Sequence, residues 1–166
     1  MDAQFRFDDD GGPTFTIRVE EVERMDAAMV RTVIEIDLQT FAEGTFSAYT
    51  AAVFLQHGRL FVLRADDAVI GTCVCMRSWD DREAASIVAM GIRPGWRGRG
   101  LGQRFVSQVL AALGRSGVRT VALFVAPENR RALSVYRDVG FHEVDERVAD
   151  PRSGERLKRL EITLPA

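Results

Sequence analysis

Two arginines and three glycines alternate within six residues, Arg97-Gly98-Arg99-Gly100-Leu101-Gly102, and this pattern is suited to binding phosphate. Glycines let consecutive main-chain N–H groups turn toward one point, because no Cβ obstructs them. Guanidinium groups are suited to phosphate oxygens. The first turn of a helix also attracts anions, because its N–H groups lack an intrahelical partner. The segment therefore predicts a cradle for a pyrophosphate.

The elements on either side of this segment must position it. An apolar run over 86–92 comes first and predicts a buried strand, which Pro94 helps to close. After the glycines, Leu101, Phe105 and Val109 recur at helical spacing. The spacing therefore predicts a helix that starts inside the glycines, so that the cradle leads into its first turn.

Two common types of nucleotide-binding loop do not fit the residue spacing of this segment. A P-loop needs Lys followed by Ser or Thr after its last glycine, and Gln103 follows Gly102 here. The dinucleotide fingerprint needs a third glycine where Gln103 stands, and an acidic residue about twenty positions later, where 121–123 is apolar. The remaining pattern, Arg-x-x-Gly-x-Gly after Ile-Arg-Pro, resembles motif A of the GNAT superfamily of N-acetyltransferases, whose loop holds the pyrophosphate of acetyl-CoA. A basic turn that only connects strand to helix is the alternative interpretation.

A second segment supports the same resemblance. Residues 120–126 are apolar and β-branched and predict a buried strand. Residues 128–139 predict a helix that ends at Gly140. Asn129 and Tyr136 lie two helical turns apart and so share one face. The order Asn-x-x-Ala-Leu-x-x-Tyr-x-x-x-Gly-Phe, which ends at Phe141, resembles motif B of the superfamily. Without the resemblance, Tyr136 would be interpreted as a packed core aromatic. The resemblance extends over most of the chain, but only these two motifs are specific.

The resemblance implies direct transfer of an acetyl group from acetyl-CoA to an amine in a ternary complex. It implies that Tyr136 is the general acid for the departing thiolate, and that the N–H of Ile92 or Met90 stabilises the oxyanion. No metal is expected. The residues that it places on the cofactor are Met90, Gly91, Ile92, Arg97, Gly98, Arg99, Gly100, Leu101, Gly102, Gln103 and Asn129.

The general base is not at either position where the superfamily often carries a glutamate. The strand before the cradle has Ala-Ala-Ser in its first half, ending at Ser86, and Phe124 stands five residues before Asn129. We hypothesise an α-amine or a small activated amine as the acceptor, because its lower pKa reduces the need for a strong base. Four carboxylates that could substitute, although each is more typical of a solvated loop, are Glu43, Asp81, Glu83 and Glu128.

Composition limits the class of protein. The chain has 166 residues, of which 46% are hydrophobic and 28% charged, as is usual for a globular domain. A formal net charge of -2 gives no electrostatic footprint for nucleic acid. The sequence has neither an apolar run of membrane-spanning length nor a signal-peptide pattern, so we expect a cytoplasmic protein without membrane or nucleic-acid partners. The expected partner is an amine acceptor, either a small molecule or a protein N-terminus, and a homodimer is left open.

The predicted fold is α/β of the α+β type, with a mixed, mostly antiparallel sheet of about seven strands, a splayed wedge and about four flanking helices. Residues 1–13 are acidic and glycine-ended and predict a mobile tail, and 14–166 are expected to form one domain. We expect a first helix over 21–40, a second over 46–56, and hairpins around Asp66-Asp67 and 150–154. The apolar stripe of the first helix is expected at Met25, Met29, Val33 and Ile36. Cys73 and Cys75, two residues apart on a strand, are interpreted as buried thiols.

Three function classes follow from these observations. The leading hypothesis is an acetyl-CoA-dependent N-acetyltransferase. The second is a catalytically degenerate module that binds or senses acyl-CoA, which the missing carboxylates at Ser86 and Phe124 favour slightly. The third, a protein that binds another nucleotide, fits the glycine spacing least well.

Overall fold

The structure is a computed structural model that describes residues 4–8, 13–23, 26–41, 44, 46–149, 154 and 156–165. Within these ranges the chain forms eight strands, four α-helices and one short 3-10 helix, η1. In chain order they are β1 (Gln4–Asp8), β2 (Thr14–Glu21), α1 (Ala27–Thr40), α2 (Ala48–His57), β3 (Arg59–Ala65), β4 (Ala68–Arg77), β5 (Ala84–Ile92), η1 (Pro94–Trp96), α3 (Leu101–Arg115), β6 (Thr120–Val125), α4 (Arg130–Val139), β7 (His142–Ala149) and β8 (Arg156–Thr163).

The strands follow one another in the order β1-β2-β3-β4-β5-β6-β8-β7. The β5–β6 pair is parallel, and the β1–β2, β2–β3, β3–β4, β6–β8 and β7–β8 pairs are antiparallel. This confirms the expected mixed, mostly antiparallel sheet flanked by helices. The chain divides into two compact units, which are described separately: unit 1 is Met1–Met76 with Ala89–Leu101, and unit 2 is Arg77–Val88 with Gly102–Ala166.

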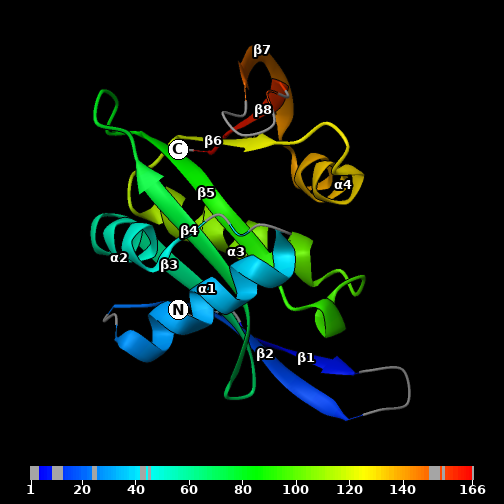
Figure 1. Cartoon of the computed structure of the whole chain (residues 1–166). Coiled ribbons are helices and arrows are strands. Elements are labelled where there is room, and N and C mark those ends of the chain that lie inside the picture. The colour runs from blue at the N-terminus through cyan, green and yellow to red at the C-terminus, as the bar shows by residue number, and fades with distance from the viewer. Residues whose placement is uncertain are drawn as a thin grey trace. The chain divides into compact units, whose positions relative to one another are not determined.

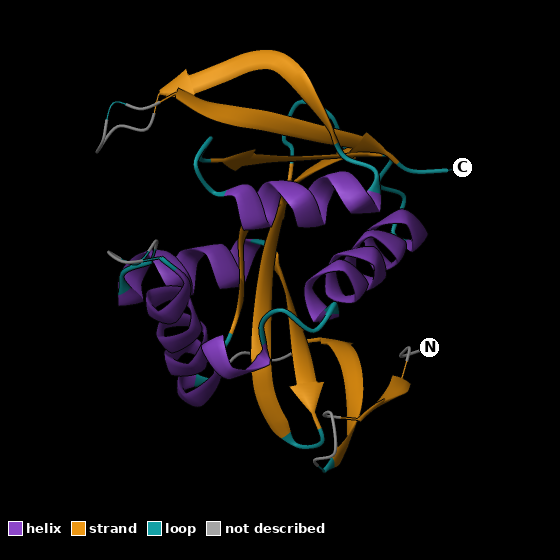
Figure 2. Ribbon diagram, turned by 90° about the vertical axis from the view of Figure 1, so that its right-hand side faces the viewer, coloured by secondary structure: helices purple, strands orange, loops and turns teal. Residues whose placement is uncertain are grey.

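In unit 1, two helices cover the same side of β3 and β4 (Figures 1 and 2). Strand β3 is buried along most of its length, because its side chains pack on both faces. The helices contribute apolar residues at helical spacing, which confirms the predicted stripe of α1 at Val33 and Ile36. Large, fully buried side chains of this core include Ile17, Val33, Ile36, Leu60, Phe61, Leu63, Ile70 and Val74.

Helix α1 begins later than predicted. The predicted start at Glu21 is wrong because β2 continues to that residue, which pairs with Phe61 of β3. Asp26 is the N-cap, and its Oδ1 accepts a hydrogen bond from the N–H of Met29 at 2.7 Å. An Asp at this position satisfies a donor that the helix leaves without a partner. Met25, which was assigned to the apolar stripe, lies outside the described residues.

Strand β1 was not predicted, because the acidic run that follows it indicated a tail. Its five residues pair with β2 in antiparallel register, and Phe7 lies directly opposite Phe15. The sequence Phe-Arg-Phe within β1 has the period of two that is typical of a strand. Part of the segment expected to form the tail is therefore the outermost strand of unit 1.

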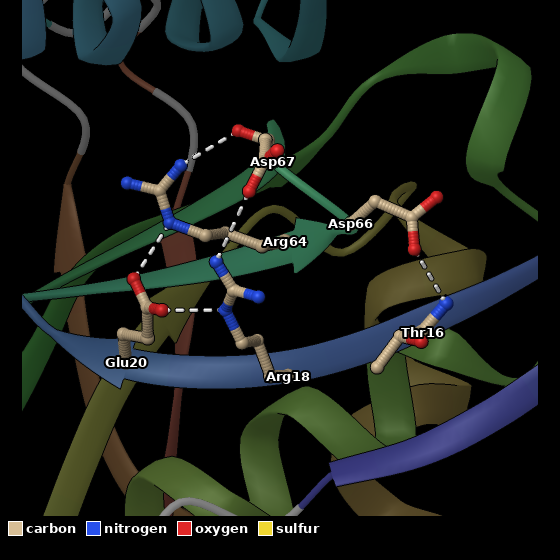
Figure 3. A network of polar contacts seen from close by, with 6 residues as sticks. All are labelled: Thr16, Arg18, Glu20, Arg64, Asp66 and Asp67. Carbon is tan, nitrogen blue, oxygen red and sulfur yellow. Dashed lines mark hydrogen bonds and ion pairs between the residues drawn. The ribbon is translucent and has the colours of Figure 1, made fainter.

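Asp66 connects the turn between β3 and β4 to β2 by hydrogen bonds (Figure 3). Asp66 has a φ of 48°, a left-handed conformation that Asp tolerates better than most residues. Its Oδ1 accepts from the N–H of Thr16 at 2.9 Å, and its own N–H donates to the Thr16 carbonyl at 2.8 Å. The predicted hairpin at Asp66-Asp67 is confirmed.

A carboxylate between two guanidinium groups extends this network (Figure 3). Glu20 accepts from the Nε of Arg18 and from the Nε of Arg64, each at 2.6 Å. Arg64 also donates from Nη1 to the main-chain oxygen of Asp67 at 2.8 Å. Partial burial raises the pKa of Glu20, but the hydrogen bonds from Arg64 and Arg18 outweigh it, and the pKa is lowered overall.

The two cysteines of β4 are buried and free, as predicted. Their Sγ atoms are 3.8 Å apart, because residues two apart on a strand point to one face. The contact with Cys75 and the burial both raise the pKa of Cys73, which favours its protonated form.

Unit 2 is built around β6 and β8 (Figure 1). The parallel ladder joins residues 84–87 of β5 to 120–123 of β6, and its last pair is Ile87 with Leu123. On its other side, β6 pairs with β8 along the whole length of β6. Strand β7 pairs with β8, and this ladder has a register shift. Helix α4 ends at Gly140, whose φ of 112° is left-handed, which confirms the predicted glycine stop. The tip of the predicted hairpin at 150–154 lies, apart from Gly154, outside the described residues.

Candidate active site

The glycine loop has backbone geometry suited to an anion. Gly98 and Gly100 have φ angles of 77° and 72°, whereas Arg97 has a φ of −81°. Asp66 is the one described non-glycine residue with positive φ, so Arg99 is negative and the sign alternates along the loop. Alternating signs of φ are a feature of anion-binding nests, and Arg97, where the loop begins, is extended, with a ψ of 159°. A Cβ added at Gly98 or Gly100 would meet no atom within 4 Å, so the loop backbone is open to an approaching ligand.

The guanidinium of Arg97 lies against protein oxygens. Its Nε donates to the Ile92 carbonyl at 2.6 Å, and its Nη2 donates to the Gln39 carbonyl at 2.8 Å. The Thr40 hydroxyl lies 3.4 Å from the same Nη2. A cation is favourable at the Gln39 carbonyl, because this carbonyl is at the C-terminal end of α1. The side chain of Arg97 therefore joins the end of β5 to α1, a role that the sequence motif did not reveal.

A second arginine strengthens the same junction. The guanidinium of Arg93 makes a two-pronged ion pair with Glu35 of α1, with N–O distances of 3.0 and 3.1 Å. Its Nε donates to the Val69 carbonyl at 3.1 Å. The hydrogen bond and charge of Arg93 lower the pKa of Glu35. The loop that follows β5 is thus attached to α1 on both sides of η1.

The other unit 1 residues that were expected at the cofactor are on β5, on the glycine loop and at the start of α3. Gly91 is buried directly under the last turn of α1, where an added Cβ would collide with Thr40 Oγ1. Ile92 is buried and Met90 half-buried. Leu101 is buried as the first residue of α3. Arg99 is half-buried, and its guanidinium lies over the rings of Phe7 and Trp96.

In unit 2, Gly102 and Gln103 lie in the first turn of α3. The side-chain Nε2 of Gln103 donates to Oδ2 of Asp138 on α4 at 2.6 Å. Ser134 Oγ lies 3.4 Å from the same carboxylate oxygen. The side-chain amide of Gln103 thus joins α3 to α4. The group that Gln103 can contribute to the expected cradle is therefore its main-chain N–H.

Asn129 comes directly before α4, and Tyr136 is in the last turn of the helix. Asn129 is the N-cap, with its Oδ1 accepting from Ala132 N–H at 3.1 Å. Tyr136 is buried, with 8% of its surface exposed, and its ring packs edge-to-face on Phe141 at 5.5 Å between centroids. Both motif B residues therefore have structural roles in α4 itself, and the ring of Tyr136 is held in one position by its packing.

Ser86 and Phe124, which replace the usual carboxylates, lie on one face of the unit 2 sheet. Ser86 pairs with Ala122, and Phe124 is two residues further along the same strand. Glu161 of β8 pairs with Ala122 from the other side, so it shares this face. The sequence alone gave no signal for Glu161, because only strand register brings it there. Its Oε2 accepts from Arg159 Nη2 at 3.0 Å, so the carboxylate is already engaged.

The four substitute carboxylates do not form a cluster in the part of the chain that is described. Asp81 and Glu83 are exposed on the loop before β5, where Asp81 Oδ1 accepts from Glu83 N–H at 2.8 Å. Glu128 is exposed just before α4. Glu43 lies outside the described residues.

No group of three or more potential metal ligands occurs among the described side chains. Across the same residues, no helix is long and apolar enough to cross a bilayer.

Comparison with known proteins settles the family. The sequence model of the Acetyltransferase (GNAT) family matches residues 27–141, more than half of the chain. The chain belongs to the GNAT acetyltransferase family. The match contains both motifs from which the resemblance was inferred.

Two relatives illustrate the sequence similarity of this GNAT protein. An uncharacterized N-acetyltransferase of Methanocaldococcus jannaschii is 31% identical over 87 residues, which are 50% of this chain and 38% of that protein. A mycothiol acetyltransferase of Rhodococcus erythropolis is 34% identical over 113 residues, which are 66% of this chain and 36% of that protein. The chain therefore spans less than half the length of these relatives.

Solved structures share the GNAT fold at low sequence identity. A Bacillus subtilis acetyltransferase in complex with CoA has a TM-score of 0.70 at 17% identity, covering 90% of this chain and 99% of that one. The ribosomal-protein-S18-alanine N-acetyltransferase of Escherichia coli has a TM-score of 0.70 at 20% identity, covering 89% and 93%. CoA is bound in the B. subtilis structure, and acetyl-CoA is the cofactor in that of a putative acetyltransferase from Salmonella typhimurium.

Proposed function

We propose that this protein transfers an acetyl group from acetyl-CoA to an amine by direct attack of the amine in a ternary complex. The observation that carries the proposal is the alternating backbone of Arg97 to Leu101, open to solvent at both glycines and continuous with the first turn of α3. In this proposal the N–H donors of the loop and of the first turn of α3 point to one diphosphate. Acetyl-CoA supplies the activated acetyl thioester.

The chain's main-chain groups bind and orient the cofactor in this proposal. The N–H groups of Gly98 to Gln103 hold the diphosphate, and Asn129 contacts the pantetheine arm. The β5–β6 ladder ends at Ile87 with Leu123, while β5 continues to Ile92. We assign the main chain of Met90, Gly91 and Ile92 to the pantetheine amides and the oxyanion. Fixing the carrier at its diphosphate places the acyl end in one orientation, which lowers the entropic part of the barrier.

Tyr136 is the proposed general acid. The phenol would give its proton to the thiolate that leaves as the C–N bond forms and the C–S bond breaks. Packing against Phe141 fixes the ring, which is what a proton donor needs to hold one geometry. A phenol is suited to this step because it stays protonated at neutral pH in its reference state.

The proposed acceptor is an α-amine or a small amine of low pKa. Reference pKa values are about 8 for an α-amine and about 10.4 for lysine, so deprotonating lysine at neutral pH costs about 3 kcal/mol more. With Ser86 and Phe124 at the usual carboxylate positions, an acceptor that needs less help is favoured. The E. coli structural neighbour, named for an alanine of a ribosomal protein, and the mycothiol acetyltransferases are consistent with varied non-lysine acceptors.

A degenerate acyl-CoA-binding module is the second candidate. The absence of a carboxylate at Ser86 and Phe124 favours it. The retention of both Asn129 and Tyr136 favours the enzyme, because a module that only binds would not need the acid.

The two candidates are separated by incubating the protein with acetyl-CoA and a panel of amines while free thiol is followed. The panel should include peptides with a free α-amine, matched peptides with an acetylated N-terminus and one lysine, and small amines. The enzyme predicts thiol release that depends on the acceptor and is faster for α-amines. Binding of CoA without such release across the panel would support the module. An efficient lysine acceptor with a basic limb near pH 7 would reject the proposed acceptor class.

A further inference from the structure

The side chain between the two left-handed glycines is held by aromatic rings. The Cζ atom of Arg99 lies 5.7 Å from the ring centroid of Phe7 and 5.7 Å from that of Trp96. Trp96 in turn packs edge-to-face on Phe15, with centroids 4.8 Å apart and an interplanar angle of 73°. We call Phe7, Phe15, Trp96 and Arg99 the aromatic clamp. All four belong to unit 1.

The clamp joins the glycine loop to the unpredicted strand β1. Phe7 and Phe15 lie opposite each other in the β1–β2 register, so their rings share one face of the hairpin. Trp96 is the last residue of η1, and Arg99 follows three residues later. Strand β1 lies outside residues 27–141, which the family model matches. The contact is therefore contributed by a part of this chain that the family match does not include.

We propose that Phe7 and Trp96 are positioning residues that hold the Arg99 guanidinium for a phosphate group of the acyl carrier. The inference rests on the proposed function, because it takes the loop to be the diphosphate site. A cation over an aromatic face is attracted by the ring's quadrupole. The N–H donors of a guanidinium lie in its own plane, so contact with a ring face does not consume them.

The clamp also compensates for the flexibility of the loop. Glycines lose more conformational entropy on ordering than other residues, and Gly98 and Gly100 flank Arg99. An arginine side chain carries a large rotamer entropy of its own. Rings that hold it before the ligand arrives remove part of both costs from binding. Strand β1 would thus contribute to cofactor affinity without touching the cofactor.

The test measures affinity for CoA and for 3′-dephospho-CoA by titration calorimetry. Trp79→Phe serves as the background, because Trp79 is 96% exposed and its removal leaves Trp96 as the one tryptophan. Phe7→Leu keeps an apolar side chain without a ring, and Phe7→Tyr restores the ring. Arg6→Ala is the matched control, since Arg6 is on the same strand with its side chain on the other face. Thermal unfolding of each variant checks that it is folded.

We expect Phe7→Leu to weaken CoA binding about two- to fivefold, and Phe7→Tyr and Arg6→Ala to bind like the background. Phe7→Leu should cause no further loss in an Arg99→Ala protein, because the ring acts through the arginine. Addition of CoA should change Trp96 emission in the background but less in Arg99→Ala. A loss with CoA alone assigns Arg99 to the 3′-phosphate, and a loss with both ligands assigns it to the diphosphate.

Other outcomes overturn the proposal. Equal affinity of Phe7→Leu and the background would show that the clamp only packs the hairpin. Independent losses from Phe7→Leu and Arg99→Ala would show that the ring does not act through the arginine. If the background protein binds neither ligand, the proposed function itself is wrong and the inference falls with it, which distinguishes the two failures.

Discussion

Tyr136 is the residue on which the chemistry of the account depends most. Replacing it with Phe removes the phenolic oxygen and keeps the ring that packs on Phe141. We expect turnover to fall on the order of a hundredfold, because general acid catalysis contributes about that much, while the affinity for CoA stays the same. Steady-state kinetics and calorimetry on the same preparation measure both quantities. An unchanged rate would reduce Tyr136 to a packing residue.

Gly100 tests the glycine loop at the level of one residue. Gly100→Asp places a side chain at a φ of 72° and a negative charge beside the proposed diphosphate, so we expect CoA binding to be abolished. Gly117→Asp is the matched control. Gly117 also has a positive φ, of 86°, and open space around it, but it follows α3 rather than preceding it. The control should lose a similar amount of stability and still bind CoA, and loss of binding in both variants would contradict the assignment.

Side-chain roles in the site were the least predictable from the sequence. The motif correctly located a glycine loop that leads into α3, because glycine spacing and helical periodicity are local properties. Two contacts of these side chains are far away in the sequence: Arg97 donates to Gln39 of α1, and Gln103 donates to Asp138 of α4. A residue type that suits phosphate also suits a carbonyl or a carboxylate, and only the fold decides which is near.

At the scale of elements, Arg97 joins β5 to α1 through the carbonyls of Ile92 and Gln39. Arg97→Ala should therefore lower the free energy of unfolding of the ligand-free protein by about 1–3 kcal/mol, because the part-buried Ile92 carbonyl loses a charged donor. As a control, Arg31→Ala removes an exposed arginine from α1 and should change the free energy of unfolding by less than about 0.5 kcal/mol. Urea denaturation measures both. Loss of CoA affinity with unchanged stability would instead make Arg97 a phosphate ligand.

Most elements could be predicted because their periodicity and end signals agree, as at β3, β4, α3 and α4. The start of α1 could not, because Glu20 and Glu21 are compatible with a helix and become strand residues only through pairing with β3. Strand β1 was hidden by the acidic residues after it, and its partner β2 stabilises it. Long-range pairing thus decided the elements that local pattern left open.

At the scale of the whole molecule, the ion pairs of unit 1 make stability depend on pH. Glu20 has a lowered pKa in the folded protein, so its contribution is complete above the unfolded value of about 4.3 and is lost as pH falls through the lower folded value. Glu20→Gln should cost roughly 0.5–1 kcal/mol at pH 7 and progressively less below about pH 4. Glu21→Gln, at a more exposed pair with Arg59, should cost less. Thermal unfolding from pH 7 to 3 measures the stability difference between Glu20→Gln and the unsubstituted protein. A difference that grew as the pH fell would contradict the role given to Glu20.

The central claim is that the main-chain amides of Gly98 to Gln103 hold the diphosphate of CoA. Backbone amide resonances of the isotopically labelled protein, followed as CoA is added, test this claim most directly. The account predicts large, saturable shifts for Gly98, Arg99, Gly100, Leu101, Gly102 and Gln103, which inorganic pyrophosphate reproduces more weakly. Saturation with CoA while these six amides stay in place would contradict it.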